Sequence, residues 1–412
     1  MHLRRLWLHA FRSYTEAEIE FAPGLTLIRG ANGTGKSNLL EAAGYLATLA
    51  SFRGAPSEAL VQLATAPESP PAGSQSAGLL SAGSPGRPDA PQERAVIRGE
   101  VRRGQRDLLI ETEIVPGGRN RTMVNKQPLS RRDPDASLQV SVFSPDDLIL
   151  VKGGPGERRA FLDELLAGLH PRNDAALKEL DRILRQRNAL LKQAGGRLTP
   201  EVGFTLDVWD AKLASTGTAV ATLRQALLEE LRTFVDEAYG DIADRPAPVV
   251  MRYEPTWMVH VDGLGGALRD GRADDMRRGL SLVGPHRDEV ELRIEGRLSR
   301  SHASQGEQRT LALALRLGGH RLLSGRLGSP PVLLLDDVFS ELDPVRSDAL
   351  IRHLPPGQAL LATAGEVPPS AAVEETVRVV RIDGRSRLST GPGMAVDKAG
   401  ETVEETASER VG

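Results

Sequence analysis

The chain has 412 residues, of which 40% are hydrophobic and 26% are charged, as expected for a globular chain of two or three domain-sized units. It has no cysteine, which excludes disulfide bridges, thiolate zinc sites, iron–sulfur clusters and cysteine nucleophiles. The formal net charge is only −3, so binding to nucleic acid or to another anion must rely on a local patch.

The chain lacks the sequence signals of a membrane or secreted protein. No stretch approaches the roughly 18–20 uninterrupted apolar residues of a membrane span. Residues 1–8 carry two arginines but not the apolar core of a signal peptide. We therefore expect a cytoplasmic protein with no membrane partner.

The first 50 residues predict strands that lead into a loop and a helix. Alternating apolar residues indicate strands as far as Phe21, and a Pro-Gly turn follows them. The short apolar run at 25–28 is typical of a buried strand. After a glycine-rich segment at 30–35, residues 37–50 have the composition of a helix.

Two segments of contrasting character follow. Residues 64–92 consist mainly of Pro, Gly, Ser and Ala, with almost no large apolar side chains. Such a segment buries too little apolar surface to offset its backbone entropy, so we expect a disordered loop insertion. Residues 94–142 then predict strands that carry many arginines.

Helical periodicity dominates from 156 to 240. Apolar residues recur there every three or four positions and predict helices of about 14–35 residues, with breaks at Pro171 and at Gly195-Gly196. A further helix is expected over 307–323 and a buried strand over 332–335.

These elements predict an α/β fold with an inserted helical subdomain. We expect residues 1–150 and 325–392 to form the α/β domain and residues 151–324 to form the helical subdomain. Residues 393–412 lean acidic and have few large apolar side chains, so they predict a flexible tail.

The strongest chemical signal is a phosphate-binding loop (P-loop) between the buried strand and the first helix. Its residues fit G-x-x-x-x-G-K-[ST] in full; they are Gly30, Ala31, Asn32, Gly33, Thr34, Gly35, Lys36 and Ser37. Glycines let the backbone wrap a polyphosphate with its N–H groups inward, and the helix dipole adds about 0.3–1 kcal/mol per favourable charge. We expect Lys36 to reach the β and γ phosphates and the Ser37 hydroxyl to ligate Mg²⁺.

A second signal is the buried strand at 332–335, which ends in two carboxylates. Such a strand is the expected partner of a P-loop. Asp336 would hold the Mg²⁺ shell, and Asp337, one step further, would orient the attacking water as the catalytic residue.

A third signal precedes the alanine- and leucine-rich helix at 307–323. A serine hydroxyl, a flexible glycine and a helix N-terminus together make a second anion site, here with Ser304, Gly306 and Gln308. Ser304 and Glu307 also fit a capping box, which is a purely local structural interpretation. The two interpretations are compatible.

The order of these motifs resembles that of the ABC-type ATPase head shared with SMC proteins. The motifs are the loop at 30–37, S-Q-G-E-Q at 304–308, L-L-L-D-D at 333–337 and S-E-L-D at 340–343. Further segments resemble the RecF family of bacterial DNA recombination and repair ATPases. These are H-A-F-R-S-Y at 9–14, F-S-P-D-D-L at 143–148, R-R-A-F-L-D at 158–163 and G-P-H-R-D-E at 284–289. The resemblance covers most of residues 1–385 and leaves out 64–92 and the tail.

The resemblance implies a P-loop ABC-type ATPase head and an ATP-dependent DNA-binding protein. In such proteins two protomers clamp two ATP molecules, so Ser304, Gly306 and Gln308 would serve the partner's nucleotide in trans. Asp343 would lie at the dimer interface. The ATPase would be weak and would act as a switch for DNA binding and dimerisation.

The resemblance also implies a biological role. RecF-like proteins act at single-strand gaps in DNA, help RecA onto single strands together with RecO and RecR, and take part in replication-fork restart and the SOS response. The implied partners are therefore double-stranded and gapped DNA, a second copy of the chain, RecR, RecO and, indirectly, RecA.

Two positions depart from the wider ABC pattern. Asp337 stands where glutamate is usual and is shorter by one methylene, which predicts slow turnover. Thr363 stands where transporter-type heads place a histidine. A glutamine that contacts Mg²⁺ is also expected, and Gln139 is the nearest candidate by position.

DNA binding has some support from the sequence itself. Between residues 94 and 132, ten basic residues stand against four acidic ones, a local net charge of about +6. Either a sequence-independent phosphate footprint or a merely solvated face explains this surplus. Aromatic residues make up only 4% of the chain, which favours backbone contacts to duplex over base stacking. The candidate contacts are Arg102, Arg103, Arg106, Arg131 and Arg132.

Other functions remain open at this stage. An ABC-type ATPase subunit of another system, either a transporter or an SMC-like protein, would share the head. A transporter subunit is expected to carry a histidine at the position of Thr363. A long-armed SMC protein would need hundreds of heptad residues, for which this chain is too short. A GTPase would need N-K-x-D, and the N-K-Q-P at 125–128 lacks the aspartate. His286 and His302 are interpreted as structural hydrogen-bonding residues and not as catalysts. An approach of His286 and Arg287 to nucleotide or DNA is the alternative for that pair.

Overall fold

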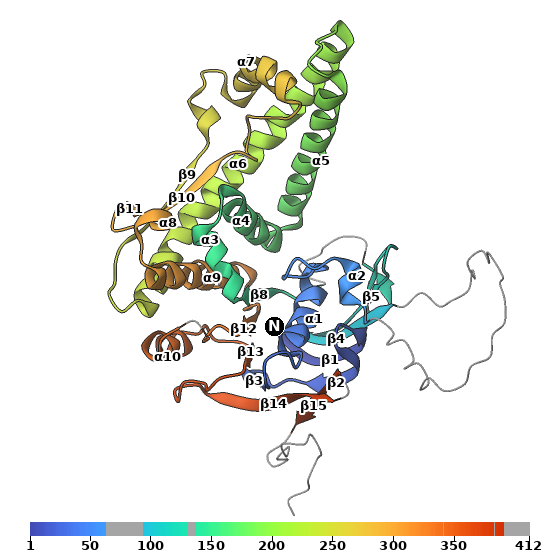
Figure 1. The fold of residues 1–412 in the computed structure, drawn as a ribbon, viewed down its shortest axis with the longest axis vertical. Coiled ribbons are helices and arrows are strands. Elements are labelled where there is room, and N and C mark those ends of the chain that lie inside the picture. The colour runs from blue at the N-terminus through green and yellow to red at the C-terminus, as the bar shows by residue number, and fades with distance from the viewer. Residues whose placement is uncertain (63–93, 130–136, 341, 383, 391–412) are drawn as a thin grey trace, which may run out of the picture. The chain divides into compact units, whose positions relative to one another are not determined.

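The computed structural model describes residues 1–62, 94–129, 137–340, 342–382 and 384–390 (Figure 1). The segment predicted as a disordered insertion, 64–92, and the predicted tail, 393–412, lie outside the described residues. The chain divides into two compact units. Unit 1 comprises Met1–His2, Ala22–Leu27 and Arg131–Glu375, and unit 2 comprises Leu3–Phe21, Ile28–Ser130 and Thr376–Gly412.

Unit 2 is built on an antiparallel sheet with the strand order β2-β1-β4-β5-β6-β7. Its strands are β1 (His2–Phe11), β2 (Tyr14–Glu20), β4 (Ala95–Arg103), β5 (Arg106–Ile114), β6 (Arg121–Val124) and β7 (Gln127–Pro128). In β4 and β5 buried residues alternate with more exposed ones, because successive side chains of a strand point to opposite faces. The buried face packs against α1 (Lys36–Thr48), and Leu46 of that helix approaches Gly99 of β4.

Unit 2 also contains the strand that leads into the P-loop. This is the end of β3 (Leu25–Arg29), which neighbours β14 (Val373–Ile382), and β14 pairs antiparallel with β15 (Arg385–Thr390). A short helix, α2 (Ser57–Leu60), completes the described part of this unit.

Unit 1 has a parallel core sheet in which the start of β3 is followed by β13 (Ala359–Thr363), β12 (Val332–Asp336) and β8 (Val140–Phe143). All five residues of β12 and of β13 are buried, as expected for strands covered on both faces. Helix α9 (Gln305–Leu327) packs against β8 of this sheet.

The remaining helices of unit 1 form a long assembly. They are η1 (Pro145–Leu148), α3 (Ile149–Lys152), α4 (Pro155–Leu169), α5 (Pro171–Ala194), α6 (Pro200–Ile242), η2 (Thr256–Val259), α7 (Gly263–Arg278), α8 (Ser299–His302) and α10 (Pro344–Arg352). A three-stranded sheet packs against α4, α6 and α8. Its strand order is β11 (Arg297–Leu298), β10 (Glu289–Ile294), β9 (Val249–Glu254). Helices α5 and α6 lie side by side, with α7 packed against both near one end of the pair (Figure 1).

The breaks predicted at Pro171 and at Gly195 are confirmed. Helix α5 begins at Pro171, and it ends at the C-cap Gly195 in the left-handed conformation that glycine favours. Helix α6 is longer than predicted, at 43 residues, because the glycines within it do not interrupt it. Gly217 has a packing role, since a Cβ there would lie 2.8 Å from Leu264 Cδ2.

The helix predicted over 307–323 and the strand predicted over 332–335 are also present, as α9 and β12. Helix α9 extends the predicted 307–323 by two residues at its start and four at its end. The division into an α/β domain and a helical subdomain over 151–324 stays a prediction. Among the described helices, none combines the length and the apolar character that crossing a bilayer requires.

Candidate nucleotide-binding site

The P-loop follows β3 in unit 2 and closes against the first turn of α1. Gly33 and Gly35 have φ angles of 78° and 109°, a region that residues with a side chain rarely adopt. A Cβ on Gly35 would lie 2.3 Å from Ser386 Oγ, so both sterics and backbone geometry require glycine there. The Lys36 ammonium is drawn into the loop, where Nζ donates to the carbonyls of Gly30 and Ala31 at 2.9 Å each. The loop therefore wraps a cationic group, as a polyphosphate site requires.

Hydrogen bonds from other parts of unit 2 brace this loop. The Tyr14 hydroxyl donates to the Gly35 carbonyl at 3.0 Å, and Arg381 Nη1 donates to the Gly33 carbonyl at 3.0 Å. Ser386 Oγ lies 2.7 Å from Ser13 Oγ and also contacts the Thr34 carbonyl. These braces hold the loop backbone in place without using its N–H groups.

An ion pair that the motif search missed lies beside the loop. Arg12 donates to both oxygens of Glu41, from Nε at 2.8 Å and from Nη2 at 2.7 Å, and the Glu41 side chain is fully buried. This bidentate pair fixes the turn that carries Ser13 against helix α1. Next to it, an open depression of about 470 Å³ is lined by polar and cationic groups that include Asn38, Arg381 and Arg385.

The two carboxylates of the second motif lie at the carboxyl end of β12 in unit 1. Asp336 is buried and is the last residue of the strand. Asp337 adopts a left-handed φ of 48°, and its N–H donates to the Ala362 carbonyl at 2.9 Å. Its own carbonyl accepts from the Ser340 hydroxyl at 2.8 Å, which closes a tight turn. Strained backbone of this kind is typical of functional turns that follow a strand.

The predicted capping box at the start of α9 is confirmed. Ser304 Oγ accepts from the Glu307 N–H at 3.3 Å, and Glu307 Oε2 accepts from the Ser304 N–H at 2.7 Å. These hydrogen bonds lower the pKa of Glu307, with a smaller contribution from Arg346 and Arg245. In this turn Ser304 is exposed and Gly306 is partly buried.

Gln308 needs a different interpretation from the one its position suggested. Its side chain is buried, and Nε2 donates to the carbonyls of Ser299 at 2.9 Å and Arg300 at 3.2 Å. The amide therefore supports the preceding turn from inside, because its donor is already used. It does not face outward with Ser304.

The position of Gln139 corrects a second expectation. The Gln139 carbonyl accepts from the Val332 N–H at 2.9 Å, so this residue lies at the amino end of the parallel pair β8–β12. Asp336 lies at the opposite end, roughly 13–16 Å further along the strand at about 3.3 Å per residue. Gln139 as the Mg²⁺-contacting glutamine is therefore wrong. Its side chain donates to Ser137 Oγ instead, at 3.1 Å.

The segment that does leave the sheet beside Asp336 is 144–148, because Phe143 pairs with Leu335. Asp147 accepts from the Ser144 N–H at 2.8 Å and from Arg316 of α9 at 2.9 Å. Burial raises the pKa of Asp147, although Arg316 opposes that shift. Arg316 also donates to Glu164 of α4 at 2.9 Å.

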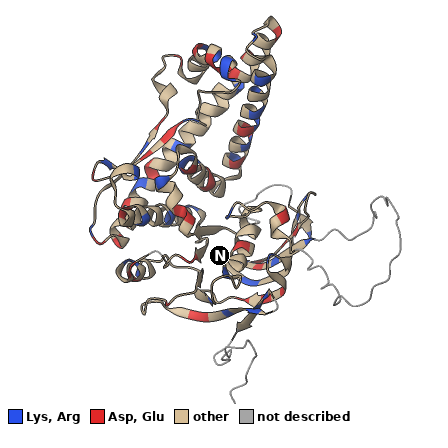
Figure 2. Ribbon diagram, in the orientation of Figure 1, with Lys and Arg blue, Asp and Glu red and all other residues tan. Residues whose placement is uncertain are grey.

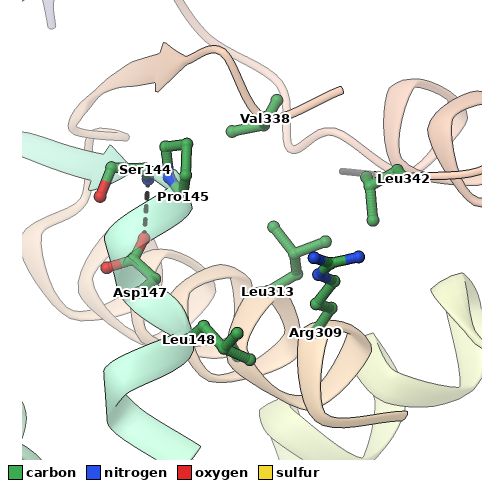
Figure 3. Close-up of a pocket in the computed structure, with 9 residues that line it drawn as sticks. Ser144, Pro145, Asp147, Leu148, Arg309, Leu313, Val338 and Leu342 are labelled. Atoms are coloured by element: carbon green, nitrogen blue, oxygen red, sulfur yellow. Dashed lines mark hydrogen bonds between the residues drawn. The ribbon is translucent and has the colours of Figure 1, made fainter. Parts of the chain in front are cut away.

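A small cavity of about 30 Å³ borders this segment (Figure 3). Leu148 from η1, Leu313 from α9, and Val338 and Leu342 from the turn after β12 line it with apolar surface. The cavity thus marks a meeting point of three segments. They are α9, which we call the signature helix because the Ser304 motif (the signature turn) begins it, the segment 144–148, and the turn after Asp336 and Asp337.

The other two predicted site residues in this region have clear local partners. Thr363 ends β13, and its Oγ1 accepts from the Gly365 N–H at 3.0 Å. Asp343 is the N-cap of α10, with Oδ1 accepting from the Arg346 N–H at 2.9 Å and Oδ2 from Arg346 Nη1 at 2.9 Å. The first of these bonds is the main cause of the lowered pKa of Asp343.

His286 is a structural residue in this structure. It is largely buried, with Nε2 3.0 Å from the Ser281 carbonyl, and burial lowers its pKa to about 4. Arg287 also donates to that carbonyl, at 3.2 Å. His302 pairs with the adjacent Ser301 hydroxyl at 2.8 Å.

Three of the arginines predicted to bind DNA, Arg102, Arg103 and Arg106, lie on the β4–β5 hairpin, which carries both basic and acidic residues (Figure 2). Arg98 pairs with Glu111 at 2.8 Å, and Arg102 faces Asp107 at 3.4 Å. Cross-strand pairs therefore engage two of the basic residues, Arg98 and Arg102, with acidic residues of β5. Arg103 and Arg106 lie opposite each other at the tip of the hairpin, whereas Arg131 and Arg132 lie outside the described residues.

The chain matches known proteins along most of its length. The family model RecF/RecN/SMC N terminal domain matches residues 2–360. The chain is 38% identical over 405 residues to the DNA replication and repair protein RecF of Streptomyces avermitilis, a match that covers 95% of this chain and 99% of that protein. It is 40% identical over 380 residues to the protein of the same name from Frankia alni, covering 88% and 93% of the two chains.

Solved structures resemble this fold as well. The recombination mediator protein RecF-ATPrS in the RecFOR pathway matches with a TM-score of 0.78 at 27% identity, over 94% of this chain and 98% of that chain. An SmcHead bound to the C-winged helix domain of ScpA matches with a TM-score of 0.53 at 17% identity, over 97% and 99% of the two chains. The second likeness concerns the fold alone.

Proposed function

The chain belongs to the RecF family, and from that premise we propose that it is an ATP-dependent DNA-binding protein of recombinational repair. The observation that carries the proposal is the P-loop of unit 2. Gly33 and Gly35 adopt the positive φ angles that glycine favours, and the Lys36 ammonium is already held inside the loop. The depression beside Arg12 and Asn38 has a size and polarity suited to the rest of a nucleotide.

The chemistry of the Ser37 hydroxyl and of the Asp336 carboxylate fits Mg²⁺, which is usually bound through one or two protein oxygens together with phosphates, and each is proposed as a ligand. When bound, it would neutralise charge on the phosphates. Within the protein, Lys36 would contribute a positive charge, and Asp337 is proposed to accept a hydrogen bond from the attacking water.

Hydrolysis is proposed to be slow and to act as a switch. The Asp337 carboxylate stands on a shorter side chain than the glutamate usual in ABC-type heads, so it would hold the water less closely. ATP would then stabilise a dimer until hydrolysis releases it. ATP can drive dimerisation only through contacts that it makes better in the dimer than in the monomer.

Those contacts are proposed to come from the signature turn of the partner. Ser304 presents a hydroxyl at the N-terminus of a 23-residue helix, and Gly306 lies in the first turn of the same helix. Because Gln308 is buried, the proposed contact set is restricted to Ser304 and Gly306. Asp343 is proposed to lie at the same interface.

DNA is proposed to bind through backbone phosphates, without reading of sequence. The proposed contacts on the β4–β5 hairpin are Arg102, Arg103 and Arg106. The substrate would be duplex next to a single-strand gap. RecO and RecR are proposed partners in loading RecA, with roles in replication-fork restart and the SOS response.

The test is the molar mass of the protein in light scattering, with and without ATP and a gapped duplex. We expect a monomer without ATP and a dimer with ATP, the latter retained on the duplex. Lys36→Met should abolish nucleotide binding. Ser304→Ala should leave nucleotide binding by the monomer intact but weaken the dimer, and Asp337→Asn should stop hydrolysis while the dimer persists. A Ser304→Ala variant that dimerises and hydrolyses normally would contradict the proposal.

A further inference from the structure

One arginine outside the recognised motifs joins two parts of the proposed dimer interface. Arg346 lies in the first turn of α10, three residues after Asp343. Its guanidinium is largely covered, with 20% of the side chain exposed. It contacts Asp343 on its own helix turn and two segments that are distant in sequence, all within unit 1.

The first contact is with Asp343. Both oxygens of this carboxylate accept from Arg346, one from the backbone N–H and one from Nη1. Asp343 is thereby held in a single orientation, as a helix cap and as an ion-pair partner at the same time.

The second contact is with Asp244, which follows the end of α6 and lies 102 residues before Arg346. Arg346 Nη2 donates to Asp244 Oδ2 at 2.7 Å. The planar guanidinium thus spans two carboxylates with two different nitrogens. An ammonium group has no such fork and holds one carboxylate well at a time.

The third contact is with the signature turn. A Cβ on Gly306 would lie 2.8 Å from Arg346 Nη1 and 3.3 Å from Cζ. The guanidinium therefore packs directly on the backbone of Gly306, and glycine is required for this approach. A movement of the guanidinium would change the position of the turn that carries Ser304.

We propose that Arg346 is a positioning residue that fixes the signature turn and Asp343 as one rigid group, so that the partner's nucleotide meets both together. The inference rests on the proposed function, in which both elements face the partner. Arg346 acts here through Gly306 and Asp343, without a contact of its own to the nucleotide. Its loss should affect the dimer but not ATP binding by a single protomer.

The test compares Arg346→Lys with the wild-type full-length chain in three measurements. These are ATP affinity at protein concentrations that keep the chain monomeric, the dissociation constant of the ATP-bound dimer, and the hydrolysis rate. We expect unchanged ATP affinity and a dimer weakened by about tenfold, the size of effect typical of a lost charge-assisted hydrogen bond. The hydrolysis rate of Arg346→Lys should fall at low protein concentration and recover as its concentration rises, which a general folding defect would not produce.

Arg352→Lys is the matched control. Arg352 lies on the same helix and pairs with Asp348, away from Gly306. This variant should match the wild type in all three measurements. An Arg346→Lys dimer as tight as the wild-type dimer would overturn the inference, and so would an Arg352→Lys dimer weakened equally.

Asp244→Asn keeps the test decisive if Arg346→Lys folds poorly. It leaves the bond between Arg346 and Asp343 in place, so we expect a smaller weakening of the dimer. In the double variant with Arg346→Lys the two effects should overlap, because both break the same bridge. Fold-changes that simply multiply would refute the bridge. A wild-type protein that stays monomeric with ATP would overturn the proposed function itself, whereas a wild type that dimerises no better than Arg346→Lys would overturn only this inference.

Discussion

Replacing Arg316 with methionine would remove the ion pair between the signature helix and the segment 144–148. Methionine keeps much of the aliphatic stem, which lies over the ring of Phe161, where the guanidinium carbon is 5.4 Å from the ring centroid. The charged end is lost. Asp147 then stays buried with one hydrogen bond, from the Ser144 N–H.

The magnitude follows from the burial of the two partners. The side chains of Arg316 and Asp147 are 19% and 8% exposed, so the pair is largely desolvated. Breaking a fully buried pair by removing one partner costs about 3–5 kcal/mol. Because Asp147 keeps the Ser144 bond, we expect about 2–4 kcal/mol. Glu164, the other partner of Arg316, is 46% exposed and adds less than about 1 kcal/mol.

The cost should also depend on pH. Burial already raises the pKa of Asp147 in the folded protein, and loss of Arg316 raises it further. A group whose pKa is raised on folding binds a proton more readily in the folded state, so acid stabilises the folded variant relative to wild type. The difference in free energy of unfolding should therefore shrink as pH falls from 7 toward 5.

Urea unfolding followed by far-UV circular dichroism measures this difference. Arg326→Met is the control on the same helix, because the Arg326 side chain is 59% exposed and should cost less than about 1 kcal/mol. The double variant Arg316→Met with Asp147→Asn should be more stable than Arg316→Met alone. The reasoning is refuted if Arg316→Met costs no more than Arg326→Met, or if its cost grows in acid.

Three further changes have definite expected outcomes. Gly35→Ala forces a side chain into Ser386 at a φ of 109°, so ATP binding measured by fluorescence titration should be lost, with destabilisation of about 1–3 kcal/mol. Glu41→Gln leaves the Arg12 guanidinium without its charged partner, so ATP affinity in the same titration should fall. The molar mass of the variant in light scattering without ATP should equal that of the wild type. Burial lowers the pKa of His320 to about 4, so the unfolded chain takes up a proton between about pH 6.5 and 4 that the folded state refuses. The stability of the wild type relative to His320→Gln should therefore drop by about 2 kcal/mol between pH 7 and 5 in urea unfolding, and no change would contradict the assignment.

Local patterns explain what could be predicted from the sequence. The P-loop is a contiguous strand, loop and helix, so its glycine spacing is enough to predict it, although the residues that brace it, such as Arg381, are distant in sequence. The capping box at Ser304 and Glu307 and the helix breaks at Pro171 and Gly195 are local in the same sense.

The expectations that failed depend on contacts between distant residues. The prediction that Gln139 contacts Mg²⁺ failed because the sequence does not say how β8 pairs with β12. The two strands are parallel, so the carboxyl end of β8 lies beside Asp336, and Gln139 lies at the other end. The orientation of Gln308 depends on the turn at 299–300. Two of the basic residues on β4 pair with acidic residues of β5 that only strand pairing brings opposite.

The bridging arginines were missed for the same reason. Arg316 and Asp147 are 169 residues apart, and Arg346 and Asp244 are 102 residues apart. An arginine on an exposed helix turn usually interacts only with solvent or with a neighbour three or four residues away. Only the packing of α9 and α10 against the rest of unit 1 gives these side chains their partners.

Mixing two inactive variants tests the central claim most directly. Lys36→Met disables the P-loop and Ser304→Arg disables the signature turn, so each variant alone should neither hydrolyse ATP nor dimerise with it. A heterodimer of the two contains one site built from an intact P-loop and an intact partner turn. Because neither variant dimerises alone, every dimer in an equimolar mixture is a heterodimer with one of its two sites intact, so the account predicts recovery of up to about half of wild-type hydrolysis at protein concentrations that saturate dimerisation. A mixture that stays inactive at every ratio and protein concentration would contradict it.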